Sequence, residues 1–193
     1  MIYRIHHDDA FLIYEVSAIE SMSQLGEQHG TFAFDSTPRS YSSVWKTLTV
    51  QFKACEPSCK NIIPDVSENF GRLFLSQKAH DCLSELLSTC GECLPVKFAD
   101  DSGYIFNPLK TSEQLDANNE KTIVHDQHGN LVNYGFHEEK VSGSPIFKTQ
   151  LDRYSGIFCL ESFKDAYEQA GLTGLMFHPD LSNPIGESFG STQ

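Results

Sequence analysis

The sequence predicts a single α+β domain, with an antiparallel or mixed sheet and at least two helices packed on it. The chain has 193 residues, of which 39% are hydrophobic and 11% aromatic, so it can bury one sizeable core. Short apolar segments of strand length recur along it, and two longer segments carry apolar residues at helical spacing. The sequence contains no internal repeat and no low-complexity linker, so we expect one domain over residues 1–193.

Three strands are predicted in the first part of the chain. AFLIYEV (residues 10–16) is an apolar segment of strand length. GTFAFDS (30–36) would place Phe32 and Phe34 on one face of an extended chain. SVWKTLTVQF (43–52) is rich in β-branched and aromatic residues, which favour strands.

The segment SQKAHDCLSELLSTCG (76–91) predicts the first helix. Ser76 can cap its start, and Gly91 can end it in the left-handed conformation. Its apolar residues fall at helical spacing: Ala79, Cys82, Leu83, Leu86 and Leu87. Two strands are expected to follow, at residues 94–98 and 103–109, with a turn between them.

The composition becomes polar and turn-rich between residues 110 and 145. One hairpin is expected there, with TIV (122–124) and LVNYGF (131–136) on either side of a loop at residues 126–130. The rest of this polar insertion offers few large apolar residues.

The second helix is predicted at SFKDAYEQAG (162–171). Ser162 and Asp165 have the spacing of a capping box, and Gly171 supplies the stop. One face should be buried, because four apolar or aromatic residues share it: Phe163, Ala166, Tyr167 and Ala170.

Strand character surrounds this second helix. It returns before the helix at residues 146–152 and 156–160, and a short strand at residues 175–177 follows the helix until Pro179 stops it. The polar tail, residues 180–193, is expected to be loosely ordered.

The charge balance disfavours nucleic acid and favours a basic partner. The chain has 26 acidic and 14 basic residues and a net charge of −12, which a phosphate backbone would repel. Complementary charge speeds the encounter with a basic protein. Within the polar insertion, a candidate partner-binding face is made of five acids and two aromatic residues: Asp116, Glu120, Asp126, Tyr134, Phe136, Glu138 and Glu139. Taken one by one, the acids are better explained as a solvated loop, and packing within the hairpin is the favoured interpretation of the two aromatic residues.

The N-terminus, MIYRIHHDDAFLIYEV, lacks the basic and apolar regions of a signal peptide. No apolar segment approaches the ~20 residues that cross a bilayer. We therefore expect a cytoplasmic protein that does not bind membranes. In that reducing compartment the six cysteines are expected to be thiols.

Two cysteine pairs give the sequence its strongest metal-site pattern. Cys55 with Cys59, and Cys90 with Cys93, could together hold a tetrahedral zinc ion. The first pair has three intervening residues instead of two, and Cys90 lies at the end of a predicted helix, where a buried thiol is ordinary, so we favour thiols and expect no metal. A second set, His125, His128 and His137 with Asp126, lies in the polar hairpin and is better explained as solvated surface residues.

Three segments resemble a known family. IIPDVSENFGRLFLSQKAHDCLSELL (62–87) resembles part of a family of bacterial polymorphic-toxin immunity proteins, the class numbered eleven, formerly a domain of unknown function. CLPVKFADDSGYIFNPL (93–109) is similar to two of its strands, and residues 144–177, which contain AGLTGLMF, resemble its end. The match covers about residues 60–110 and 145–178.

The resemblance implies a cytoplasmic protein that binds and neutralises a cognate toxin delivered by a type VI or contact-dependent apparatus. It implies occlusion without catalysis, and neither a catalytic residue nor a cofactor. No phosphate loop, Gly-x-Ser-x-Gly or dinucleotide motif suggests otherwise. Two alternatives stay open: a metal-binding regulatory protein or enzyme that uses the cysteine pairs, and a subunit that forms homo-oligomers.

Overall fold

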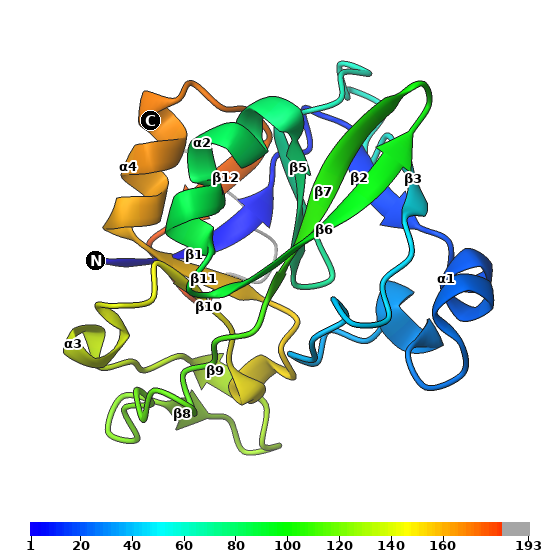
Figure 1. The fold of residues 1–193 in the computed structure, drawn as a ribbon. Coiled ribbons are helices and arrows are strands. Elements are labelled where there is room, and N and C mark those ends of the chain that lie inside the picture. Colours follow the sequence, from blue (N-terminus) through cyan, green and yellow to red (C-terminus); the bar gives the residue numbers. More distant parts are fainter. Residues whose placement is uncertain (183–193) are drawn as a thin grey trace.

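The computed structural model describes residues 1–182, which form one α+β domain built on two main sheets (Figure 1). The predicted fold class, with a mixed sheet and at least two packed helices, is confirmed. Most of the tail that we expected to be loosely ordered, residues 183–193, lies outside the described part of the chain.

The first sheet joins the two ends of the chain. Strand β1 (Ile2–His7) pairs antiparallel with β11 (Ile157–Leu160) on one side and with β12 (Leu175–His178) on the other. Strand β10 (Ile146–Phe147) completes the order β10-β11-β1-β12. The predicted strands at residues 146–152, 156–160 and 175–177 are therefore present, although the first of them is only two residues long and a short 3₁₀ helix, η2 (Gln150–Asp152), takes up its end.

The second sheet is mixed and has six strands in the order β2-β3-β6-β7-β5-β4. Strands β3 and β6 are parallel, and the other neighbours are antiparallel. Their bounds are β2 (Ile13–Val16), β3 (Leu48–Lys53), β4 (Val66–Asn69), β5 (Arg72–Ser76), β6 (Gly91–Phe98) and β7 (Asp101–Pro108).

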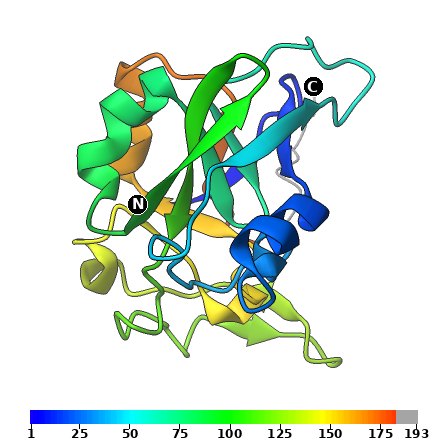
Figure 2. The same ribbon diagram turned by 45° about the vertical axis from the view of Figure 1, so that its right-hand side comes forward.

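Side chains bridge the two edge strands of this sheet, β2 and β4. The Tyr14 backbone N–H donates to Ser67 Oγ at 3.3 Å, and Asn69 Nδ2 donates to the Tyr14 carbonyl at 2.7 Å. Polar groups that would otherwise be left open at a sheet edge are therefore satisfied. The sheet curls until its first and last strands meet (Figure 2).

Helices α2 (Gln77–Leu87) and α4 (Glu161–Gln169) lie side by side over the junction of the two sheets (Figure 1). The Ser76 cap is confirmed, because its Oγ accepts from the Ala79 N–H at 3.1 Å. The predicted stop at Gly91 is wrong: α2 ends at Leu87 and Gly91 begins β6, where a Cβ would lie 2.3 Å from the Asn107 carbonyl oxygen.

The start of α4 also differs from the prediction. The helix begins at Glu161, directly after β11, and no side chain caps it, so the Ser162 capping box does not form. The stop at Gly171 is confirmed, since Gly171 has φ 57° directly after the last helical residues. The predicted buried face is present, with Phe163 and Tyr167 in the core.

The strand predicted at residues 30–36 is wrong. Residues Gly30–Ala33 form a 3₁₀ helix, η1, which packs on helix α1 (Ala18–Leu25), a helix that the sequence did not predict. Phenylalanines two residues apart point to the same face in a strand, which is why the sequence predicted one. In the 3₁₀ helix they point in different directions, and Phe32 is 1% exposed whereas Phe34 is 56% exposed.

Residues 110–145 form a polar lobe beside the first sheet. The predicted hairpin is confirmed as β8 (Val124–His125) and β9 (Leu131–Asn133), and a short helix, α3 (Glu138–Val141), follows it. A small hydrophobic cluster that includes Phe147 and Phe158 fastens the lobe to β10 and β11. In the described part of the chain, every helix is too short or too polar to cross a bilayer.

Candidate functional site

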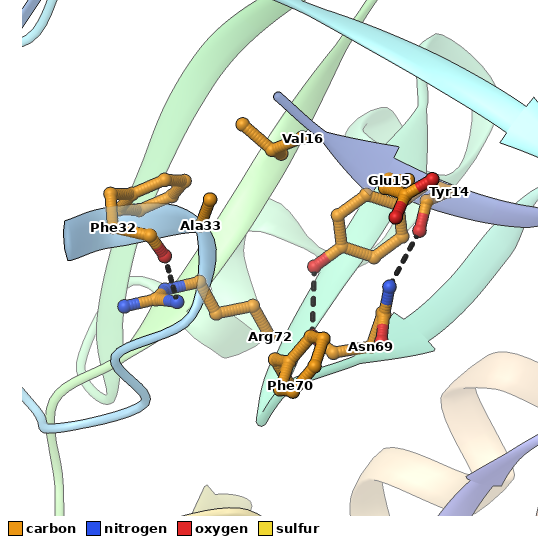
Figure 3. Close-up of a pocket in the computed structure, with 8 residues that line it drawn as sticks. All are labelled: Tyr14, Glu15, Val16, Phe32, Ala33, Asn69, Phe70 and Arg72. Atoms are coloured by element: carbon orange, nitrogen blue, oxygen red, sulfur yellow. Dashed lines mark hydrogen bonds between the residues drawn. The ribbon is translucent and has the colours of Figure 1, made fainter. Parts of the chain in front are cut away.

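An exposed groove opens where β2, η1 and the β4–β5 turn meet. Its inner end is a small cavity of about 40 Å³, shown in Figure 3, which Arg72 and Tyr14 help to line. The outer part is an open depression of about 420 Å³. We call this outer part the aromatic groove; it is lined by Glu15, Val16, Ser17, Ala18, Ala33, Phe34, Gln51 and Phe70.

Two phenylalanines give the aromatic groove its character. Phe34, after η1, and Phe70, in the β4–β5 turn, each leave 56% of their surface exposed. Helix α1, whose first residue lines the groove, also exposes Ile19 at 82% and Met22 at 55%, although neither of them lines the depression. Single exposed apolar side chains are ordinary, but two exposed aromatic rings in one depression are typical of a protein-binding surface.

The backbone holds Phe70 outward in an unfavourable conformation. Phe70 and Gly71 are the two central residues between the paired residues Asn69 and Arg72, with φ 48° and 67°. A two-residue hairpin turn with two positive φ values favours Asn-Gly, and a bulky side chain in the left-handed region costs about 1–2 kcal/mol. Strain of this kind is concentrated at functional positions.

Beneath the groove, buried Arg72 organises the floor. Its guanidinium donates to the Phe32 carbonyl at 2.8 Å and to the Asp35 carbonyl at 2.6 Å, and it lies 4.1 Å from the centre of the Phe32 ring. Arg72 Nε also donates to Asn107 Oδ1 at 3.0 Å. Figure 3 shows the Tyr14 hydroxyl bound to the Asn69 carbonyl, at 3.1 Å. With these polar groups engaged by the protein, the floor is a rigid support for the two exposed rings.

A buried charge cluster joins the loops behind the groove. Lys148 is fully buried and its Nζ donates to the Ser36 carbonyl at 2.6 Å. Burial, and then the charge of Arg72, lowers the pKa of Lys148 to about 7, while burial raises the pKa of Glu68 to about 7. Burial also raises the pKa of Asp152.

Perturbed titrating groups are frequent in active sites, but the contacts of this cluster are structural. Glu68 Oε1 accepts from the Gly71 N–H at 3.0 Å, next to the strained turn. Asp152 Oδ2 accepts from the Gly156 N–H at 3.0 Å and from the Tyr134 hydroxyl at 3.2 Å. The buried ammonium of Lys148 therefore links the loop after η1, through Ser36, to the segment between β10 and η2 that follows the polar lobe.

The acids that the sequence offered as a partner-binding face lie on the surface of the polar lobe, but four of the five are engaged locally. Asp116 pairs with Lys140, Glu138 with the N-terminal amine at 3.3 Å, and Glu139 with His137 at 3.4 Å. Asp126 accepts from the His128 and Asn130 backbone N–H groups at 2.8 and 2.9 Å, which shapes the hairpin loop. Glu120 is exposed as well.

The two aromatic residues expected on that face, Tyr134 and Phe136, do not project from it. Both are half-buried and pack against the ring of Phe158, at 5.0 and 5.2 Å between ring centres. The polar lobe has few apolar residues, so both rings are needed to pack the lobe against β10 and β11 and are not available on its surface. Among residues 1–182, the large aromatic side chains that are exposed, Phe34 and Phe70, lie in the aromatic groove instead.

The four cysteines that could have formed a zinc site do not converge. Cys90 is buried after α2 and Cys93 lies on β6, where burial raises its pKa to about 11. Cys55 and Cys59 lie in the loop after β3. Across residues 1–182, only Cys55 among them belongs to a cluster of three or more metal-ligating side chains, and the hairpin histidines belong to none.

Comparison with other proteins adds no family assignment. The chain matches no model of a known protein family, and no curated protein matches it. Sequence reasoning missed the aromatic groove, although Asn-Phe-Gly, in the position of a tight turn before an apolar segment, was a signal for it.

Proposed function

We propose that this protein binds another protein through the aromatic groove and neutralises it by occlusion, as a cytoplasmic immunity protein neutralises its cognate bacterial toxin. The observation that carries this proposal is Phe70, an exposed aromatic ring held at a turn position where Asn would be more stable. Phe70 keeps this strain at the surface, and Phe34, equally exposed, lines the same groove, so both rings are available to a partner.

The chemistry of the partner follows from charge. The net charge of −12 favours a protein with a basic surface, such as a nuclease whose active site binds phosphate. The resemblance of residues 62–87 and 144–177 to polymorphic-toxin immunity proteins supports the same class of partner. Two contacts bring the loop after η1 near the polar lobe: Ser36 Oγ donates to the Arg153 carbonyl at 3.1 Å, and the Tyr134 hydroxyl of the lobe donates to Asp152 at 3.2 Å. Acids of the lobe can therefore steer a partner toward the groove.

Occlusion requires a stable surface instead of a reacting group. A standard interface buries about 1,600 Å², with most binding energy concentrated in a few central anchors. Phe34 and Phe70 are the anchors we assign, and their rigid floor lowers the entropy lost on binding. Turnover of a substrate by the pure chain would overturn this mechanism.

The proposal expects a toxin domain to be encoded in a reading frame adjacent to this one, and the test uses that domain. Cells that produce that domain should grow only when they also produce this chain, and the two proteins should co-purify. The double variant F34A/F70A should bind at least about 100-fold more weakly. A matched control, V124A/V132A, removes two similarly exposed residues from the β8–β9 hairpin and should bind normally.

Two results would reject the proposal: absence of protection and binding by the wild-type chain, or equal affinity of F34A/F70A and the control. The charge step is tested separately. Replacing Asp116, Glu138 and Glu139 with Lys should slow association by about tenfold at low salt and leave thermal stability nearly unchanged. Full protection and an unchanged association rate would remove the acidic residues from the mechanism while leaving the aromatic anchors in place.

A further inference from the structure

A buried ammonium group lies between the two segments that carry the exposed rings of the aromatic groove. Lys148 is fully buried, and its Nζ donates to the Ser36 carbonyl at 2.6 Å, two residues after Phe34. The same side chain packs on Gly71, the residue after Phe70, where an added Cβ would lie 2.8 Å from Lys148 Cε and 2.9 Å from Nζ. Lys148 therefore contacts both segments at once.

The charged groups around Lys148 come from several other elements. Arg72 on β5 repels the ammonium, and three carboxylates attract it: Glu68 on β4, Asp152 in η2 and Asp35 after η1. Within residues 1–182 no carboxylate forms an ion pair with Lys148, and Asp152 lies instead 3.9 Å from Arg4 Nη2. An enclosed ammonium without a paired carboxylate is costly, so the amine releases its proton more easily than it does in water.

The loop that covers this ammonium is held by few contacts. Two hydrogen bonds fasten Ser36: Lys148 donates to its carbonyl, and its Oγ donates to the Arg153 carbonyl at 3.1 Å. Ser36 and the two residues after it form no helix or strand. Arg72 still holds the Asp35 carbonyl, at 2.6 Å, so the loop can loosen without unfolding of η1. Segments of this kind open locally far more often than a whole domain unfolds.

We infer that Lys148 and Ser36 form a proton-controlled latch that sets how firmly the aromatic groove is held. In the closed latch the amine is enclosed and supports both segments, whereas in the open latch Ser36 is released and the amine reaches water. Opening removes the bond beside Phe34 and the packing beneath Gly71. The role of the latch in partner binding rests on the proposed function.

The sign of the effect follows from proton linkage. Burial, and then the charge of Arg72, lowers the pKa of Lys148 to about 7 in the closed latch, whereas in water it has its ordinary value of 10.5. Between these values the open latch holds a proton that the closed latch has released, so closure strengthens as the pH rises. From pH 7.5 to 9 the ratio of open to closed latch should fall by about 20-fold. Burial raises the pKa of Glu68 from 4.5 to about 7, so its contribution falls below this window.

The first test uses the isolated full chain and carbon-detected NMR, which does not depend on exchangeable amide protons. The Lys148 Cε signal should titrate with a midpoint below about pH 9, and the Ser36 carbonyl signal should follow it. The backbone signals of Phe34 and Phe70 should shift with the same midpoint. A Lys148 midpoint at or above about pH 9 would overturn the latch, and constant signals at both phenylalanines would overturn its control of the groove.

Two variants separate the latch from a general effect of pH. Lys148→Met should abolish the titration at Ser36, Phe34 and Phe70. Ser36→Ala keeps the carbonyl but removes the bond to Arg153, so the midpoint of Lys148 should rise toward its value in water. The matched control is Ser88→Ala, which removes an exposed hydroxyl that also donates to a backbone carbonyl and should leave the midpoint unchanged. An unchanged midpoint in Ser36→Ala would overturn the latch even if Lys148→Met failed to fold.

The second test measures affinity for the proposed toxin partner at pH 7.5 and pH 9. A closed latch preorganises the groove, so the affinity of the wild-type chain relative to Lys148→Met should rise at least about threefold across this interval. The comparison with the variant cancels the titration of the partner itself. A constant ratio would overturn the role of the latch in binding. Absence of toxin binding by the wild-type chain would reject the proposed function, while the NMR test of the latch would stand on its own.

Discussion

The aromatic groove and the polar lobe use their aromatic residues in opposite ways. In the lobe, Tyr134 and Phe136 come from a polar segment but turn inward against Phe158. In the groove, Phe34 and Phe70 stay exposed while the polar groups beneath them are bound by the protein. A region that is poor in apolar residues needs its aromatic rings to pack its own small core. A region that packs on an already complete core can leave aromatic rings exposed.

The largest expected effect separates these two roles by stability. Phe136→Ala should lower the free energy of unfolding by about 2–3 kcal/mol, because it removes half-buried contacts with Phe147 and Phe158. Phe34→Ala should change it by less than about 0.5 kcal/mol, because Phe34 is 56% exposed. Chemical denaturation of both variants measures the difference. Equal losses would mean that the groove rings are as structural as those of the lobe.

Much of the fold could be predicted because its signals are local. Ser76 and the apolar stripe that includes Leu83 define α2 within a dozen residues, and the hairpin of the lobe follows from a turn between two short apolar segments. The strand at residues 30–36 failed because Phe32 and Phe34 alone cannot distinguish a strand from a 3₁₀ helix. The pairing of β1 with β11 and β12 joins the two ends of the chain, and no local pattern encodes it.

The candidate sites were harder to predict because they are assembled from distant segments. Phe34 and Phe70 become neighbours of one groove only after β2, η1 and β4 come together. The cysteine pattern drew attention to Cys90 and Cys93, but no cluster of metal-ligating side chains in residues 1–182 contains either of them. Lys148 follows two apolar residues in the sequence, and nothing local shows that its ammonium group is enclosed.

Lys148 contacts the loop behind the groove from the segment that follows the polar lobe. The pH dependence of stability therefore shows how much this buried side chain contributes. Folding lowers its pKa from the ordinary value of 10.5 to about 7, because the ammonium is buried near Arg72, while Glu68, Asp152 and Asp35 act in the opposite direction. Between pH 7 and 10.5 the unfolded chain holds a proton that the folded chain has released. The free energy of unfolding therefore rises with pH in that window.

Lys148→Met removes this proton and should remove this part of the pH dependence. Relative to the variant, the wild-type protein should gain about 2 kcal/mol of stability between pH 7.5 and pH 9.5. Urea unfolding of both proteins, with thiols kept reduced, measures the change. Parallel pH profiles would show that the ammonium of Lys148 keeps its ordinary pKa in the folded protein. Lys164→Met serves as a control, because Lys164 lies near the protein surface beside Glu168.

The smallest expected effect is also the sharpest test of why the groove differs from the lobe. Phe70→Asn creates the Asn-Gly pair that suits two successive positive φ values, and it removes an exposed ring that contributes little to packing. The free energy of unfolding of the variant should be about 0.5–1 kcal/mol higher than that of the wild-type protein, measured by thermal and chemical denaturation.

In the lobe, the matching change Phe136→Asn should destabilise the fold strongly. If Phe70→Asn were destabilising, the ring would be held by packing and the left-handed turn would be no evidence for a binding role. If it stabilises the fold and also weakens binding to the proposed toxin partner, Phe70 is retained for recognition although it lowers stability.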